Sequence, residues 1–465
     1  MELITAISDF LWGNIIGYVL LALGLVYSIG LFFPQVRYFG HALSVMRSSL
    51  KGGDGRISGF STLMASVGSQ VGTGSLVGVS SALAAGGPGA IFWMWVTAAF
   101  GMVITFGETV LGQVYRERQE DGTYRGGTAY YIEKGLGSRP LAIVIAVLYI
   151  LGIGIAIASI QTNSIANAVT GVVEINPLIP GVVVIALVGL VTVGGVKRLA
   201  DISNLIVPFM ALGYLAIVIF IMVANAAALP EAVTTIIQAA FHPSAAVGGV
   251  GGYTIMEAFR HGTARGLFSN DAGNGSAAMM HATADVKHPV QQAMLGMLGT
   301  FIATILICSA TAFAILSTGA LAGGHDGINL LQDAFSTGVG DAGRWVVLAA
   351  MFLFGFTTLL ANVFYGETNL RFIFRSKAGG PIWVYRIIAV VLLAVSSITP
   401  LSSIWAFVDF FMALIVFVNL VALLILFRHV RGALQDYVRQ RRAGVDQPVW
   451  PGRETEADSE AVRSS

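Results

Sequence analysis

Long apolar stretches separated by short polar loops dominate the chain, and several of them, such as residues 15–33, 140–160 and 410–427, are continuously apolar. A helix needs roughly 20 residues to cross a hydrocarbon core about 30 Å thick, and open sheets or loops cannot face lipid. The pattern therefore predicts an all-α integral membrane protein. We place about eleven transmembrane helices at residues 10–33, 60–84, 88–114, 140–171, 181–195, 203–227, 248–284, 290–318, 344–371, 383–398 and 402–428.

Basic residues in the loops provide an independent test of this helix count, because Lys and Arg in short loops accumulate on the cytoplasmic side. One set of alternate loops holds nearly all of them, whereas the opposite set has Arg344 as its only basic residue. This alternation predicts an N-terminus outside the cell and a cytoplasmic C-terminus. Arg260 and Arg265 fit the pattern poorly, so we expect them to be paired within the protein.

Composition agrees with a lipid environment. Only 11% of the residues are charged and 55% are hydrophobic, where soluble proteins carry about 25% charged residues. The net charge of +1, without a basic stripe, argues against a nucleic-acid partner. A single cysteine, Cys308, excludes an intramolecular disulfide. The first span lacks the features of a cleaved signal peptide, so we expect it to be retained in the cell membrane.

Two of the predicted spans are interrupted by glycine and polar residues. The second contains GSQVGTGS at residues 68–75, and the seventh contains SNDAGNGS at residues 269–276. They lie five helices apart, which predicts two inverted repeats of five helices, at 56–227 and 228–430. An extra helix and loop (1–55) would precede the repeats, and a largely disordered cytoplasmic tail (431–465) would follow them.

Such interruptions suit a binding site near the bilayer midplane. Glycine tolerates an unwound turn, and small polar side chains satisfy the backbone groups that the turn releases. Exposed amides at the start of a half-helix suit a carboxylate, and exposed carbonyls suit a hard cation such as sodium. Alternatively, Gly74 and Gly275 mark close helix crossings, and the polar side chains bond to the preceding helical turn.

These segments resemble the alanine/glycine:cation symporter family, whose members have a LeuT-type fold, over residues 56–425. The resemblance rests on VGTG at 71–74, GGPGA at 86–90, FWMWVT at 92–97, GVKR at 195–198, RGLFSNDAG at 265–273 and YGE at 365–367. It implies that the chain is a symporter, not an enzyme, and that it imports a small neutral amino acid with Na⁺ and needs no tightly bound cofactor.

The resemblance also implies two sets of site residues. Those that would bind the amino acid are Thr73, Gly74, Gln161, Ser269, Asn270 and Gly273. Those that would bind sodium through carbonyls or hydroxyls are Gly68, Val71, Phe354, Thr357 and Thr358.

Two positions that line the pocket by analogy depart from the family pattern. Ser75 stands where the family usually has Asn, and Asn362 stands where it usually has Trp. Losing an indole opens space and adds an amide donor and acceptor, which suits a substrate larger or more polar than alanine.

Other functions remain open at this stage. A proton-coupled transporter would use Glu108 or Asp409, although carboxylates near helix ends more often pair with a loop arginine, as we expect for Glu108 and Glu367. A channel would need a continuous polar pore lining. An intramembrane hydrolase built on Ser75 would need a base at the same depth, and the apolar spans offer none. The sequence carries no signal of oligomeric state.

Overall fold

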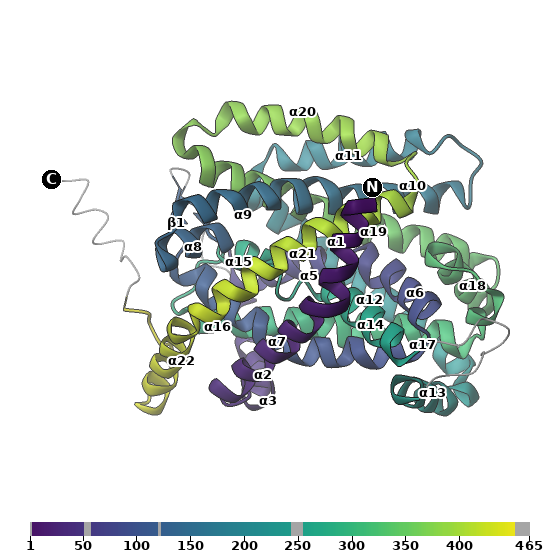
Figure 1. The fold of residues 1–465 in the computed structure, drawn as a ribbon, viewed down its shortest axis with the longest axis horizontal. Helices are drawn as coiled ribbons and strands as arrows, with labels where there is room; N and C mark the ends of the chain where they lie inside the picture. Colours follow the sequence, from purple (N-terminus) through teal and green to yellow (C-terminus); the bar gives the residue numbers. More distant parts are fainter. Residues whose placement is uncertain (1, 51–56, 120–121, 243–253, 452–465) are drawn as a thin grey trace.

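The computed structural model describes residues 2–50, 57–119, 122–242 and 254–451, which are mostly helical (Figure 1). Within these ranges, eight helices are long and apolar enough to cross a membrane. They are α1 (Glu2–Leu11) with α2 (Gly17–Gly30), α7 (Gly89–Val114), α9 (Arg139–Leu151) with α10 (Ala158–Thr170), α12 (Gly195–Ala224), α16 (Pro289–Thr300) with α17 (Ser309–Ser317), α19 (Ala342–Phe374), α20 (Gly379–Ser396) and α21 (Leu401–Ile425). π-Helical segments join the three pairs, at Trp12–Ile16, Gly152–Ile157 and Phe301–Cys308. The prediction of a largely helical membrane protein is confirmed.

Three further predicted spans are also helical, but each is short or broken. One is the 15-residue apolar helix α11 (Leu178–Thr192). The other two are the glycine-interrupted spans, now seen as α5 (Gly59–Gln70) followed by α6 (Thr73–Gly86), and α14 (Ile255–Asn270) followed by α15 (Ser276–His281). A capping box between Thr254 and Glu257 starts α14, and the predicted start at residue 248 lies outside the described residues.

Several short elements were not predicted, because they do not reach the length or hydropathy of a membrane span. The helices among them are α3 (Pro34–Arg37), α4 (Phe39–Ser48), α8 (Thr128–Leu136), α13 (Leu229–Phe241), α18 (Gly327–Val339) and α22 (Phe427–Arg442), with 3₁₀ turns at Ala226–Ala228, Ala320–Gly323 and Arg375–Lys377. An antiparallel pair of two-residue strands, β1 (Glu117–Arg118) and β2 (Tyr124–Arg125), completes the set.

The expectation of a largely disordered tail from residue 431 is wrong for its first part. Helix α22 continues to Arg442 and buries Val430, Ala433 and Tyr437 against α7 and α16. Its apolar residues recur every three or four positions, which gives the helix one face to bury. Residues 452–465 of the predicted tail, and residues 51–56 near the first predicted boundary, lie outside the described residues.

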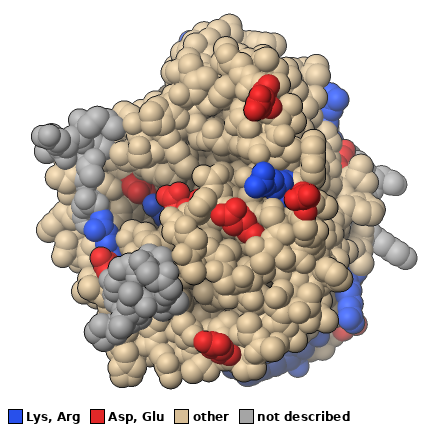
Figure 2. Space-filling model, turned by 90° about the vertical axis from the view of Figure 1, so that its right-hand side faces the viewer, with Lys and Arg blue, Asp and Glu red and all other residues tan. Residues whose placement is uncertain are grey.

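The helices pack around two central ones. Helix α7 lies beside α2, α14 and α16, and α19 lies beside α5, α10, α12 and α18. Helices α11 and α20 run together along one edge of the molecule in Figure 1. Large apolar side chains stay exposed on the outward faces of α12 and α20, for example Phe209 at 75% and Ile387 at 63%. Such outward faces suit contact with lipid. Figure 2 looks onto the end of the molecule that carries α13 and α18, where charged side chains are scattered among uncharged ones.

Candidate functional site

The two broken helices meet at their breaks. The first break consists of Val71 and Gly72, and the second runs from 271 to 275. The Ser69 hydroxyl donates to Asp271 Oδ2 at 3.3 Å, which joins the end of α5 to the start of the second break. On the other side of the first break, the hydroxyls of Ser75 and Ser269 are 3.0 Å apart. Two segments about 200 residues apart in the chain are thus held together by direct polar contacts.

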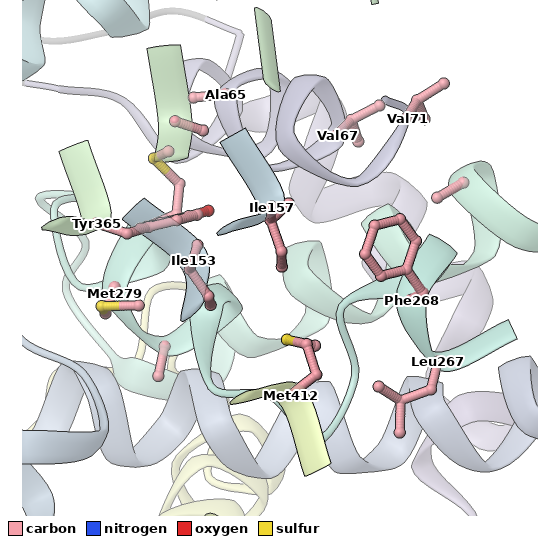
Figure 3. Close-up of a cluster of buried hydrophobic side chains, with 14 of the residues drawn as sticks. Ala65, Val67, Val71, Ile153, Ile157, Leu267, Phe268, Met279, Tyr365 and Met412 are labelled. Atoms are coloured by element: carbon pink, nitrogen blue, oxygen red, sulfur yellow. The ribbon is translucent and has the colours of Figure 1, made fainter. Parts of the chain in front are cut away.

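A small cavity opens between the breaks. It is lined by Ser69, Gln70, Gly72, Gly74, Ile153, Ile157, Gln161, Phe268, Asp271, Ser276, Thr358, Asn362 and Tyr365. Figure 3 shows Ile153 and Ile157 between Tyr365 on one side and Phe268 on the other. Both isoleucines belong to the π-helical segment Gly152–Ile157, and π turns inside helices are frequent at functional sites. The cavity therefore combines an apolar wall with polar groups from both breaks.

Close packing at the first break explains its glycines. A Cβ atom added to Gly72 would lie 2.4 Å from the Thr358 hydroxyl oxygen, and one added to Gly74 would lie 2.5 Å from the Phe268 ring. Helix α6 starts here, so its first amides have no carbonyl four residues earlier in the same helix to bond to. One of them, the amide of Thr73, donates to Gln161 Oε1 at 3.0 Å. The positive end of the α6 dipole therefore faces the cavity.

Asp271 places a carboxylate at the second break. It adopts a left-handed conformation with φ of 56° and ends α14. Its Oδ1 accepts from the side-chain amide of Asn274 at 2.8 Å, and its Oδ2 accepts from Ser69. Neither bond comes from a cationic side chain, so the site presents to the cavity a buried carboxylate that a cationic group of a ligand could compensate. Sequence reasoning missed this residue, although an acidic side chain inside an interrupted span is itself a signal of function.

Several polar atoms that line the cavity have no hydrogen-bond partner among the described residues. They are both amide atoms of Gln70, the amide nitrogen of Asn362 and the hydroxyl of Ser276. Gln70 is 3% exposed and Asn362 is 2% exposed. A buried polar atom without a partner costs about 1–3 kcal/mol, so such atoms mark places where a polar ligand is favoured.

Hydroxyls and carbonyls converge beside the first break. The Thr357 hydroxyl donates to the carbonyls of Gly68 at 3.1 Å and Phe354 at 3.1 Å. The Thr358 hydroxyl lies 2.9 Å from the same two carbonyls and 3.3 Å from that of Ser69. Oxygen ligands without thiolate or imidazole suit a hard cation. Within the described ranges, no group of three or more His, Cys, Asp or Glu residues is placed to hold a metal ion.

The structure brings many of the predicted residues to this region. Gly74, Gln161, Asn362 and Thr358 line the cavity, and Thr73 contacts it through Gln161. Of the five predicted sodium ligands, Gly68, Phe354, Thr357 and Thr358 form the oxygen cluster just described. Val71 lies next to this cluster at the end of α5, where its amide donates to the carbonyl of Val67 at 2.7 Å.

Besides Thr73, four predicted substrate residues do not line the cavity. The hydroxyl of Ser75 bonds to the carbonyl of Gln70 at 3.1 Å, and the hydroxyl of Ser269 lies 2.8 Å from the thiol of Cys308. Asn270 caps the amide of Ala272 at 3.0 Å, and the carbonyl of Gly273 accepts from Asn419 at 2.8 Å. These residues form hydrogen bonds within the breaks or to neighbouring helices without lining the cavity.

The cavity also includes residues that sequence reasoning did not select. Besides Asp271, they are Ser69, Gln70, Gly72, Ile153, Ile157, Phe268, Ser276 and Tyr365. Except for Tyr365, which belongs to α19, the polar members lie within the interrupted segments, so extending the selection across each whole break would have found them. The isoleucines carry no signal that separates them from lipid-facing residues.

The intramembrane carboxylates differ in how they are neutralised. Glu367 pairs with Arg386 of α20 at 2.7 Å, and Asp409 pairs with Arg265 at 3.4 Å. The expectation that Arg265 is paired within the protein is confirmed. The arginine partner expected for Glu108 is not found among the described residues; its Oε1 instead accepts from the amide of Gly275 at 2.9 Å.

Comparison with known proteins gives a consistent result. The model of the sodium:alanine symporter family matches residues 1–450. The amino-acid carrier protein AlsT of Bacillus subtilis is 39% identical over 97% of this chain and 94% of its own. The probable sodium/glutamine symporter GlnT of the same organism is 38% identical over 95% and 91%. The sodium/alanine symporter AgcS of Methanococcus maripaludis is 34% identical over 92% and 94%.

A solved structure shows a related fold at low sequence identity. A mutant of the manganese transporter of Eremococcus coleocola superposes with a TM-score of 0.53 at 13% identity, over 90% of this chain and 86% of that one. That transporter is of the Nramp type and has a LeuT-type fold. At this identity the likeness speaks for the arrangement of helices alone.

Proposed function

We propose that this chain, which belongs to the sodium:alanine symporter family, imports a small neutral amino acid by alternating access. Its family makes it a sodium-coupled amino-acid symporter in a membrane and not an enzyme. The observation that carries the proposal is the meeting of two broken helices around a cavity that has a half-helix N-terminus on one side and a carboxylate on the other.

The fold proposed for this activity has eleven spans in two inverted repeats, 56–227 and 228–430, with residues 1–55 as an added helix and loop. Two observations support this fold. Each proposed repeat has one of the broken helices near its start, and a transporter with a LeuT-type fold superposes over most of the chain. An N-terminus outside and a cytoplasmic C-terminus follow from the distribution of Lys and Arg in the loops. Residues 431–465 then lie in the cytoplasm.

We assign the two charged groups of the amino acid to the two breaks. The substrate carboxylate would lie at the first turn of α6, where amides around Thr73 and Gly74 and the helix dipole favour an anion. The substrate ammonium would lie near Asp271, the carboxylate that lines the cavity at the second break. Gln161 fixes the Thr73 amide and thereby orients the first turn. The two breaks would be held in place by Ser75, Ser269, Asn270 and Gly273, which would not contact the substrate.

The substrate side chain would then face the wall of the cavity that carries Asn362, Gln70 and the two isoleucines. The amide nitrogen of Asn362 and both amide atoms of Gln70 have no partner among the described residues. A side-chain carboxamide could satisfy such groups, whereas alanine leaves them unpaired. We therefore propose that the preferred substrate is more polar than alanine, with glutamine as the leading candidate.

Sodium would bind at the cluster formed by Gly68, Phe354, Thr357 and Thr358, with the carbonyl of Val71 as a further ligand. Carbonyl and hydroxyl oxygens from two helices can replace the hydration shell of a hard cation. The cluster adjoins the cavity because Thr358 belongs to both. Occupation of the cation site would therefore hold α5 and α19 in the arrangement that the amino acid needs.

Uptake into proteoliposomes tests this function. A panel of radiolabelled neutral amino acids, including alanine, glycine and glutamine, would be offered with an inward sodium gradient and, separately, with an inward proton gradient. We expect accumulation with the sodium gradient, and glutamine to compete better than alanine. Accumulation driven by protons alone would contradict the sodium site, and preference for alanine would contradict the proposed side-chain contacts.

A further inference from the structure

Glu108 of α7 lies against the second break and is not among the residues that line the cavity. The side chain is 0% exposed. Its Oε1 accepts from the backbone amide of Gly275 at 2.9 Å and from the side-chain amide of Asn419 at 2.6 Å. Asn419 of α21 also donates to the carbonyl of Gly273 at 2.8 Å. Glu108 and Asn419 together hold both glycines of the break in place.

The remaining bonds to this break come from neutral groups. The Tyr149 hydroxyl donates to the carbonyl of Asn274 at 2.5 Å and lies 2.6 Å from the hydroxyl of Thr128. A Cβ atom added to Gly275 would lie 2.1 Å from both hydroxyls, so the backbone here is tightly enclosed. The break is thus bonded by side chains of α5, α7, α9 and α21, and Thr128 of α8 contacts Tyr149. Glu108 is the acidic member of this group.

Among the described residues, no cationic side chain pairs with Glu108, and its Oε2 has no hydrogen-bond partner although it is buried. An ionised carboxylate in such a setting is strongly disfavoured, and a group of this kind commonly becomes neutral instead. A proton on Oε2 removes the charge and leaves both bonds to Oε1 intact.

We propose that Glu108 is a proton-binding site of the transporter: in the closed arrangement its carboxylate holds one proton as a neutral acid, and it releases that proton to water when the second break opens. The inference rests on the proposed function, because it assumes that the break carries part of the amino-acid site. The substrate ammonium would compensate Asp271 but not Glu108. Glu108 therefore needs a proton for closure even when substrate is present.

Few other titratable groups face this site. Those near Glu108 are Tyr27 of α2, Tyr131 of α8, Tyr149 of α9 and Asp271 in the break itself. The tyrosines are neutral in the range in which transport is measured, and Asp271 takes part in substrate binding. His281 of α15 faces Gln292 of α16, at 2.7 Å from its side-chain nitrogen. Glu108 is thus the group whose protonation would limit closure.

The test is the pH profile of sodium-driven uptake at saturating sodium and substrate, from about pH 5.5 to about pH 9. If closure needs a proton on Glu108, wild-type uptake falls on the alkaline side, approaching about tenfold per pH unit. Glu108→Gln is neutral at every pH and keeps an oxygen that accepts from Gly275. We expect this variant to transport amino acid and to lose the alkaline fall.

A matched control is Glu367→Gln, which neutralises another buried carboxylate, one that Arg386 already pairs. This variant should keep the shape of the wild-type profile even if its rate is lower. A Glu108→Gln variant that keeps the wild-type alkaline fall would overturn the proposal, and so would a folded Glu108→Gln protein that is inactive at every pH. Lack of sodium-driven uptake by the wild type would instead refute the proposed function.

A second measurement needs no variant. Adding saturating sodium and substrate to weakly buffered wild-type protein should make the medium more alkaline, by up to one proton per molecule, because closure traps a proton on Glu108. The size of this change should peak near the midpoint of the alkaline fall in uptake. Binding of substrate without proton uptake at any starting pH would contradict the proposal independently of Glu108→Gln.

Discussion

The hydroxyl of Thr358 lies 2.9 Å from the carbonyl of Gly68, which joins α19 to the last turn of α5 across 290 positions of sequence. The neighbouring Thr357 donates to the same carbonyl at 3.1 Å. Both hydroxyls also bond within their own helix, to the carbonyl of Phe354. Each threonine hydroxyl therefore lies within hydrogen-bond distance of a carbonyl in its own helix and of a carbonyl in α5.

Thr358→Ala should weaken activation by sodium more than it weakens amino-acid binding measured at saturating sodium. It removes one oxygen from the cluster, and a loss of about 1.4 kcal/mol raises the half-activating sodium concentration about tenfold. Thr358→Ser keeps the oxygen and serves as the matched control. Sodium titrations of uptake and of substrate binding would separate the two effects, and equal losses in both would argue against a ligand role.

Gly72→Ala should impair transport severely, because the new methyl group would lie 2.4 Å from the Thr358 oxygen and 3.1 Å from that of Gln161. Gly78→Ala offers a matched control in helix α6, which follows the break, since a Cβ atom there meets no atom within 4 Å. Uptake and thermal stability of both variants would be compared. A Gly72→Ala protein with wild-type sodium affinity would show that the first break does not support the cation site.

Asn362→Trp should shift preference toward alanine or glycine. The indole fills the space beside Ile157 and removes the amide that a polar substrate would contact. We expect the ratio of inhibition constants for glutamine and alanine to rise by about tenfold, the effect of one lost hydrogen bond to a buried partner. Competition against a common labelled substrate measures this ratio. Unchanged selectivity would remove Asn362 from the substrate contacts.

Acidification should loosen the docking of α22. His288 precedes α16 and lies 3.3 Å from Asp436 of α22, and burial lowers the pKa of His288 although Asp436 opposes this shift. Because the folded pKa lies below the unfolded one, this docking stabilises the protein above about pH 6.5 and loses strength as the pH falls below that value. Melting temperatures of detergent-solubilised protein would fall with acid more steeply for the wild type than for His288→Asn, which cannot titrate. Parallel curves would contradict this role.

Both breaks could be located from the sequence, because clusters of glycine and polar residues interrupt spans that are otherwise apolar. Sequence reasoning also selected the residues of the oxygen cluster, through a resemblance that joined Gly68 to Thr358; their role as sodium ligands stays a prediction. It did not separate the residues facing the cavity from those behind it. Asn270 and Gly273 turn away because the break of 271–275 takes left-handed conformations at Asp271 and at glycines, and the resulting change of direction has no periodicity in the sequence.

The short helices were missed for a different reason. Helices α13 and α22 each bury a few apolar side chains on one face, so a search for continuous hydropathy passes over them. For α22, five arginines between 428 and 442 indicated a cytoplasmic segment but gave no sign of a buried face. The structure shows instead that long basic side chains surround one buried stripe, which contains Val430, Ala433 and Tyr437.

Helix α19 runs for 33 residues without a break, about 50 Å at 1.5 Å per residue. Less than three turns of this helix carry Thr358, Asn362 and Glu367. One continuous helix therefore holds the proposed cation ligand, the proposed contact to the substrate side chain and the ion pair with Arg386. A tilt that parts Thr358 from Gly68 must also displace Asn362 and strain the bond to Arg386. A movement of α19 as one rigid helix would therefore release the proposed ion and the proposed amino acid together.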